Sequence, residues 1–321
     1  MAEATLSKDA NANAVDITAL AAIAAGEVYQ LRDGRAGVKA GLQAAATGDP
    51  ATFLTAGQFT LAKTASVVIL PGGRVYWDRS ANTATPLQAA AGGDFFIGVA
   101  PDGAASAATT VVVDLNVKPN YLVDLHESGF DSVIVLTAGT PTIMSRGGEV
   151  HAAFSATNEA QKLDLLSRQS VPVTIPMIFE AKFSVLTVAD AAVGDLSVGL
   201  ANATHASDAD QITESGFFHQ DSGTDLNLDA ESDDGTTEVA AADTLVDIVA
   251  GTDVEVWIDA RDLTDMHYYV DGVEVLAATT FDISLATGPL KALFHWEKSA
   301  DDSPGEVRLS HMAIRTMDLA T

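Results

Sequence analysis

The strongest structural signal in this 321-residue chain is the segment Tyr268-Tyr269-Val270-Asp271-Gly272-Val273-Glu274-Val275. Two short runs rich in β-branched and aromatic residues flank the pair Asp271-Gly272, and an Asp-Gly pair readily adopts the positive φ angles that a tight two-residue turn requires. The segment therefore predicts a β-hairpin.

The sequence around this hairpin repeats the same pattern of short apolar runs separated by Gly, Pro, Asn and Asp, which is typical of all-β domains. Many antiparallel strands over some 200 residues predict a two-sheet sandwich in the second half. Shorter runs in the first half predict a small barrel or sandwich. Strands are expected at 27–31, 52–61, 66–70, 74–78, 95–100, 109–115, 178–188, 196–200, 216–219, 225–230, 254–260, 290–296 and 306–314, with one helix at 158–168.

Charge divides the chain into two unlike halves. Residues 1–118 hold eight Lys and Arg against ten Asp and Glu, whereas residues 119–321 hold nine against thirty-four. Such a step indicates a domain boundary, and the connector Asn116-Val117-Lys118-Pro119-Asn120 contains the proline expected there. We predict an extended arm at 1–14, a β-domain at 15–118 and an acidic sandwich at 119–321.

Composition excludes several classes of function. The chain has no cysteine, which excludes disulfides, thiolate catalysis and zinc–thiolate sites. A net charge of −27 argues against nucleic-acid binding, which depends on clustered Lys and Arg. No apolar run approaches the roughly 20 residues of a membrane helix, and the N-terminus has no basic-then-apolar leader, so we expect neither membrane insertion nor secretion.

The segment 208–243 contains eleven acidic residues and no Lys or Arg. Clustered carboxylates suit calcium, but the alternation from Asp225 to Glu231 is that of a half-buried strand and fails the EF-hand pattern. A solvated sheet face is the favoured interpretation. The seven histidines lack H-E-x-x-H spacing, so we assign no metal site and no cofactor.

Catalytic signatures are weak. Asp253, Glu255 and Asp259 share one face of an expected strand, as glycosidase carboxylates do, but their spacing departs from the glycosidase pattern. No nucleophile elbow, P-loop or dinucleotide-binding fingerprint occurs. We therefore expect a protein that is not an enzyme.

Residues 15–116 contain a series of short β-type segments in a fixed order. They are Gly26-Glu27-Val28-Tyr29, Ala36-Gly37-Val38, Ala56-Gly57-Gln58-Phe59-Thr60-Leu61-Ala62-Lys63, Gly72-Gly73-Arg74-Val75-Tyr76-Trp77-Asp78, Phe96-Ile97-Gly98-Val99-Ala100 and Thr109-Thr110-Val111-Val112-Val113-Asp114-Leu115-Asn116. In order and spacing, this set resembles the small all-β decoration, or cement, proteins of phage heads. The resemblance implies that this module binds the major capsid protein, and Phe59, Tyr76 and Trp77 are the candidate docking residues.

The second half contains Phe179-Glu180-Ala181-Lys182-Phe183-Ser184-Val185 and further strand-like segments at residues 194–200, 254–259 and 266–275. On these segments it is similar to concanavalin-type and laminin-G-type jelly rolls, a group that includes lectins, glycosidases, adhesion modules and plain spacers. Trp257, Tyr269 and Trp296 are candidates for stacking on a sugar ring, although a core position is favoured for Trp257.

Together these features predict a structural capsid decoration protein on the outer surface of the virion, where it stabilises the head as a homotrimer. The alternative is a glycan-binding head appendage that adheres to host surfaces. The two hypotheses share the docking module and differ in whether the aromatic residues of the sandwich line an open groove.

Overall fold

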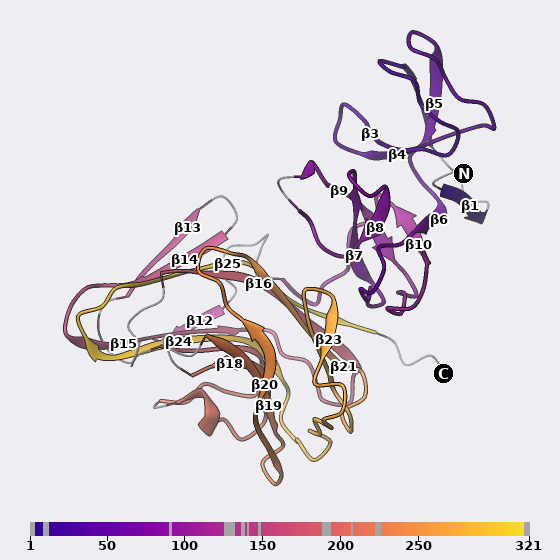
Figure 1. Cartoon of the computed structure of the whole chain (residues 1–321). Coiled ribbons are helices and arrows are strands. Elements are labelled where there is room, and N and C mark those ends of the chain that lie inside the picture. The colour runs from indigo at the N-terminus through magenta and orange to yellow at the C-terminus, as the bar shows by residue number, and fades with distance from the viewer. Residues whose placement is uncertain are drawn as a thin grey trace. The chain divides into compact units, whose positions relative to one another are not determined.

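The computed structural model describes residues 4–8, 13–89, 92–124, 132–135, 139, 141–146, 149–187, 194–206, 208–221 and 226–317. Strands dominate these residues, which confirms the all-β class (Figure 1). The chain divides into two compact units, Met1–Asn120 and Tyr121–Thr321. In the part of the chain described, no helix is long and apolar enough to cross a membrane.

The first unit contains a small barrel. Its six-stranded antiparallel sheet has the order β1-β6-β10-β9-β7-β8. A bridge between Lys63 and Ala84 brings β8 back to β6 and closes the sheet. The strands are β1 (Ala4–Lys8), β6 (Gln58–Ala62), β7 (Gly73–Asp78), β8 (Thr83–Thr85), β9 (Phe95–Ala100) and β10 (Thr110–Leu115).

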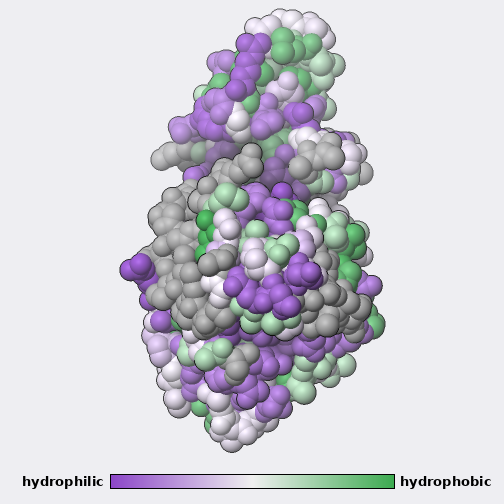
Figure 2. All heavy atoms as spheres, turned by 90° about the vertical axis from the view of Figure 1, so that its left-hand side faces the viewer, coloured by the Kyte–Doolittle hydropathy of each residue, from purple (hydrophilic) through white to green (hydrophobic). Residues whose placement is uncertain are grey.

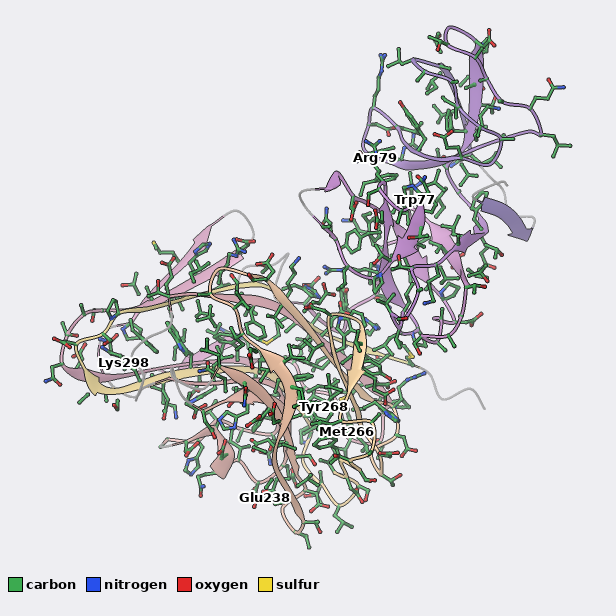
Figure 3. All side chains as sticks on the ribbon, in the orientation of Figure 1. Trp77, Arg79, Glu238, Met266, Tyr268 and Lys298 are labelled. Atoms are coloured by element: carbon green, nitrogen blue, oxygen red, sulfur yellow. The ribbon has the colours of Figure 1, made fainter. Side chains whose placement is uncertain are left out.

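Alternation along each strand sets the core of this barrel. On β7, Val75 and Trp77 are buried, whereas Arg74 and Tyr76 lie on the other face, as the two-residue period of a strand requires. Trp77 packs inside the barrel with Phe59 and other apolar residues (Figure 3).

A four-stranded sheet completes the first unit, in the order β2-β5-β4-β3. Asn116 ties this sheet to the barrel. Its side-chain Oδ1 accepts from the Ala36 amide at 2.8 Å, and its Nδ2 donates to the carbonyls of Ala36 at 2.9 Å and Thr55 at 2.8 Å. The strands are β2 (Ala14–Thr18), β3 (Val28–Gln30), β4 (Ala36–Lys39) and β5 (Pro50–Leu54).

The second unit is a jelly-roll sandwich of two antiparallel sheets with one shared apolar core. The first sheet comprises β13 (Thr142–Arg146), β14 (Glu149–Phe154), β25 (Gly305–Thr316), β16 (Met177–Thr187), β21 (Val254–Ala260), β22 (His267–Val270) and β23 (Val273–Val275), with β11 (Val123–Asp124) paired to β25. The second comprises β12 (Ser132–Val135), β15 (Glu159–Ser167), β24 (Lys291–Asp301), β17 (Asp195–Ala201), β18 (Ser215–Gln220), β19 (Asn227–Asp233) and β20 (Glu238–Asp247).

Several local predictions are confirmed. Asp271 and Gly272 have φ angles of 48° and 77° and connect β22 to β23, so the expected hairpin is present. The strands expected at 95–100 and 254–260 coincide with β9 and β21.

The helix expected at 158–168 is wrong, because this segment forms β15. Leu163 and Leu165 face the core between the sheets, while Leu166 packs on the opposite face with Phe217 and Leu293. A strand that buries apolar residues on both faces has no two-residue period, so its pattern imitates part of a helical stripe.

Three other expectations also need correction. No strand forms over 66–70, where Ile69 makes only an isolated bridge to Ala104. The run 52–61 is divided between β5 and β6 around Gly57, whose φ of 115° turns the chain. Asp225 lies outside the described residues, as do residues 1–3 and 9–12 of the expected arm, while residues 4–8 form β1 along β6.

Five Lys and Arg side chains are buried among the described residues: Lys39, Lys63, Lys162, Lys298 and Arg315. All four lysines donate to backbone carbonyl groups. Lys63 Nζ donates to the carbonyls of Thr64 and Val67, and Lys298 Nζ donates to those of Ser155, Thr157 and Ser303.

Candidate functional site

The three docking candidates of the first unit occupy different positions. Phe59 and Trp77 are each 1% exposed in the barrel core, so their side chains do not reach the surface. Tyr76 is half-buried on the outer face, where its ring meets that of Phe96 edge-on at 5.9 Å. Tyr76 is therefore the one of the three that can contact a partner directly.

The three aromatic candidates of the second unit are all buried. Trp296 is 3% exposed and stacks on Phe154 at 3.7 Å within the core. Trp257 and Tyr269 lie on the opposite face of their sheet from the core, yet they are only 4% and 7% exposed. Their rings lie 6.2 Å apart, and the Trp257 indole donates to Glu255. Little ring surface remains for a sugar.

The strand carboxylates considered for glycoside hydrolysis are engaged elsewhere. Asp253 pairs with Lys182 and Arg308, and Asp259 pairs with Arg261. These ion pairs give Asp253 and Asp259 a structural role in the sheet.

Polar side chains instead form two rows across the outer face of the seven-stranded sheet. On β15, β17 and β24 polar residues lie two positions apart, while the residues between them, Leu163, Leu196 and Trp296, face the core. The strand register then aligns them from β15 to β18. One row is Asp164, His295, Ser197 and His219, and the next is Lys162, Glu297 and Asp195.

A short connection covers part of this face. It contains the 3-10 turn η2 (Ala209–Gln211), and its Ala209 and Ile212 pack on Phe217 and Leu293. This packing brings Asp210 to the sheet, where its Oδ1 lies 3.2 Å from His219 Nδ1.

The two histidines of this cluster are almost fully buried, each 1% exposed. His295 Nδ1 lies 2.5 Å from Asp164 Oδ1, and its Nε2 lies 3.6 Å from both Asp195 Oδ2 and Glu297 Oε2. His219 Nε2 lies 2.8 Å from Asp221 Oδ1 and 3.1 Å from Asp195 Oδ1.

Burial and neighbouring charges act in opposite directions on these groups. Burial by itself lowers the pKa of His295, but Asp164 and Asp195 outweigh it and raise the pKa to about 9. The pKa of His219 is also raised, because Asp195, Asp221 and Glu231 outweigh its burial. Burial and neighbouring carboxylates raise the pKa of Asp210 to about 7.

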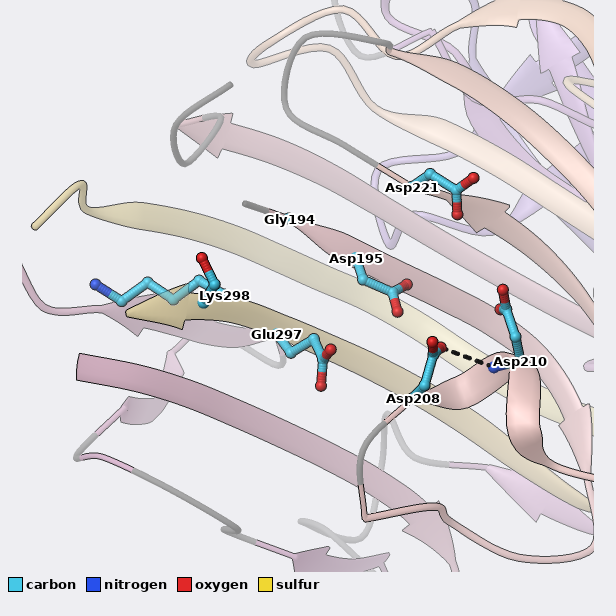
Figure 4. A pocket seen from close by; sticks show the side chains of 8 residues that line it. Gly194, Asp195, Asp208, Asp210, Asp221, Glu297 and Lys298 are labelled. Carbon is cyan, nitrogen blue, oxygen red and sulfur yellow. Dashed lines mark hydrogen bonds between the residues drawn. The ribbon is translucent and has the colours of Figure 1, made fainter. Parts of the chain in front are cut away.

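A pocket of about 240 Å³ opens beside the cluster (Figure 4). Asp195 and Glu297 line it from the sheet, while Asp208, Asp210 and Asp221 line it from the connections. Lys298 also borders the pocket, but its ammonium group points away, toward the backbone carbonyls that it binds (Figure 4). The lining is therefore predominantly anionic.

Sequence reasoning missed this cluster, although part of it lies within the acidic segment 208–243. The expected solvated face holds for Glu238 and Asp243, which are exposed on β20. It does not hold for Glu231, which is buried 3.8 Å from His219. The available signal was the repeated polar pair two residues apart in Lys162/Asp164, Asp195/Ser197, His219/Asp221 and His295/Glu297.

The structure thus defines an all-β protein in which a small barrel precedes a jelly-roll sandwich with an acidic pocket on one sheet. Residues 9–115 match the model of a family described as phage cement protein. The match covers about a third of the chain and confirms the resemblance noted for the first half. No curated protein matches the chain.

Solved structures resemble the sandwich only distantly. One, associated with endo-acting O-glycanases that human gut microbiota express for mucin breakdown, is 11% identical with a TM-score of 0.47, covering 62% of this chain and all of that one. The carbohydrate recognition domain of Emp47p is 13% identical with a TM-score of 0.44, covering 61% and 94%. A Bacillus subtilis protein with a galectin-like fold is 9% identical with a TM-score of 0.43, covering 61% and 95%.

Proposed function

We propose that the chain is a decoration, or cement, protein of a phage head, whose first unit binds the outer surface of the major capsid protein lattice and stabilises the shell. The observation that carries the proposal is the phage cement match, because residues 9–115 fall entirely within the first compact unit. The protein then acts by adhesion rather than by catalysis.

The charge distribution supports this assignment of roles. The first unit is nearly neutral, so its approach to a large protein surface costs little electrostatic repulsion. The second unit holds almost all of the net negative charge and would face solvent. On the face of the molecule in Figure 2, hydrophilic residues are prominent and hydrophobic ones form only small patches.

Tyr76 and Phe96 supply a partly exposed aromatic pair for docking. A capsid lattice presents local threefold positions, and closed symmetric oligomers are the common solution for such sites. We therefore propose a homotrimer on the particle.

Cosedimentation with phage heads that lack this chain tests the proposal. We expect the wild-type protein to sediment with the heads and to delay their thermal disruption, and Tyr76→Ala to weaken binding by about tenfold, since truncation of an aromatic anchor often costs at least 1–2 kcal/mol. Val273→Ala, at an exposed apolar position of the second unit, is the control and should bind normally.

Two results would reject this function. One is a set of heads that neither bind the wild-type chain nor gain stability from it. The other is a particle reconstruction in which residues 180–315 lie against the shell.

The alternative, a glycan-binding head appendage, gains no support from Trp257, Tyr269 and Trp296, whose rings are covered. Saturable binding on a glycan array that is lost in Trp257→Ala would favour it over a purely structural role.

A further inference from the structure

The two ring nitrogens of His295 differ: Nδ1 has a hydrogen-bond partner and Nε2 has none in the part of the chain that the structure describes. Asp164 holds Nδ1 at 2.5 Å, and because an ionised carboxylate only accepts, Nδ1 is the donor. Nε2 is buried and has no hydrogen-bond partner among the described residues. An orphaned imidazole nitrogen in a buried site indicates a ligand, since such groups are almost always paired.

The atoms in front of Nε2 have the spacing of metal ligands. Asp195 Oδ2 and Glu297 Oε2 both lie 3.6 Å from it, which is too far for a hydrogen bond. Three ligand atoms bound tetrahedrally to one zinc ion at about 2.1 Å would lie about 3.4 Å apart. The three side chains can each offer one atom to a common ion.

The cluster also has too few positive charges. Six carboxylates contact Lys162 or the two histidines: Asp164, Asp195, Asp210, Asp221, Glu231 and Glu297. These six carboxylates outnumber the ammonium group and the two imidazoles that contact them, even with both imidazoles protonated, although Asp210 and Asp221 are exposed to solvent.

Another buried carboxylate of the same unit shows the opposite arrangement. Glu180, on β16, receives Arg315, His311 and the Tyr121 hydroxyl, so its charge and both of its oxygens are matched by protein groups. Of these two clusters, only that of His295 leaves room for an external cation.

We propose that the second unit binds a divalent transition-metal ion of the zinc class between Asp195, His295 and Glu297, with Asp164 orienting the imidazole. A nitrogen ligand together with carboxylate oxygens favours such an ion over calcium or magnesium, which select oxygen alone. The Asp164–His295 contact is the carboxylate–histidine arrangement that commonly supports bound zinc. Asp195 and Glu297 border the pocket, which gives the ion an entry path and an open coordination position.

His219 has a different role in this scheme. Its nitrogens also lack a well-aligned hydrogen bond to any described residue, but Nε2 lies 2.8 Å from Asp221 and 3.1 Å from Asp195, and Nδ1 lies 3.2 Å from Asp210. These contacts are shorter than those of His295 Nε2, so His219 acts as a cationic partner that holds the Asp195 carboxylate in place. Binding of the ion at His295 requires release of any proton carried by Nε2.

Titration of the full-length, tag-free and chelator-treated protein with Zn²⁺ tests the proposal. We expect one tightly bound equivalent, and visible absorption bands when Co²⁺ replaces Zn²⁺. Glu297→Gln removes one ligand charge while preserving shape and should weaken Zn²⁺ binding at least tenfold. Asp164→Asn should weaken it by about 10- to 100-fold through the imidazole.

The matched control is Glu274→Gln. Glu274 also contacts a histidine, with its Oε1 2.8 Å from His267 Nδ1, but it lies on the other sheet. Zn²⁺ binding should be unchanged in this variant, and thermal melting should show that all three variants fold.

The absence of a stoichiometric Zn²⁺ site, binding by folded Glu297→Gln equal to wild type, or preferential binding of Ca²⁺ would each overturn the proposal. These measurements use the isolated protein, so their outcome is independent of capsid binding.

Discussion

Replacement of Asn116 by glycine should separate the four-stranded sheet from the barrel within the first unit. Asn116 has a φ of 60°, a conformation that glycine adopts without strain. The substitution Asn116→Gly therefore removes the side-chain amide without straining the backbone. The change deletes three hydrogen bonds of 2.8–2.9 Å and leaves the buried backbone of Ala36 without these partners.

The expected cost follows from these bonds. At about 0.5–1.5 kcal/mol each, three bonds contribute about 1.5–4.5 kcal/mol to the free energy of unfolding. One kcal/mol shifts the melting midpoint of a unit of this size by roughly 4 °C, which predicts a fall of about 6–18 °C. Asn116→Asp should cost at least as much at neutral pH, because its second oxygen faces the carbonyls of Ala36 and Thr55.

Differential scanning calorimetry of the full chain measures the effect, and hydrogen exchange over residues 28–39 assigns it to the four-stranded sheet. The second unit provides the internal control, since its transition should not move. A shift of less than about 2 °C in the first unit, with unchanged exchange at Ala36, would refute the role given to Asn116.

Three further predictions concern other parts of the chain. A Cβ on Gly98 would lie 2.0 Å from the Asp114 carbonyl oxygen, so Gly98→Ala should prevent the barrel from folding, as judged by near-ultraviolet circular dichroism. Gly34 has a φ of 87° and open space around it, so Gly34→Ala should lower the free energy of unfolding by only about 1–2 kcal/mol. Equal effects of the two substitutions would contradict this reasoning. Trp296→Ala removes the stack on Phe154 and should destabilise the second unit by about 3–5 kcal/mol in thermal melts, and a loss below about 1 kcal/mol would show that the core packing is misassigned. Free Zn²⁺ at about 100 times its dissociation constant should stabilise the second unit by about 2.7 kcal/mol, reversibly on chelation, and an unchanged melting temperature would count against the site.

Local signals in the sequence were sufficient for much of the fold. The hairpin at Asp271-Gly272 depends on two adjacent residues, and β21 shows its two-residue alternation within seven positions. The segment around Leu163, Leu165 and Leu166 could not be assigned in this way, because its pattern depends on which surfaces cover the two faces of the strand.

The proposed metal site could not be predicted from the sequence for a related reason. His295, Asp195 and Asp164 are far apart in the sequence and meet only through the register of β15, β24 and β17. A period-two polar pattern indicates which residues share a face, but not which strands are neighbours. The burial of Phe59 and Trp77 likewise follows from closure of the barrel rather than from their own strands.

The balance of buried and exposed charge in the second unit has an electrostatic consequence. Lys162, Lys298 and Arg315 are buried, but so are six carboxylates, and the surface that meets water still carries most of the large excess of Asp and Glu; the buried carboxylates are Asp164, Glu180, Glu214, Glu231, Asp234 and Asp259. The range of that field is set by dissolved salt, from about 30 Å at 0.01 M to about 10 Å at 0.1 M. Any particle that displays many copies of this unit should stay dispersed in dilute buffer and approach its neighbours more closely as ionic strength rises.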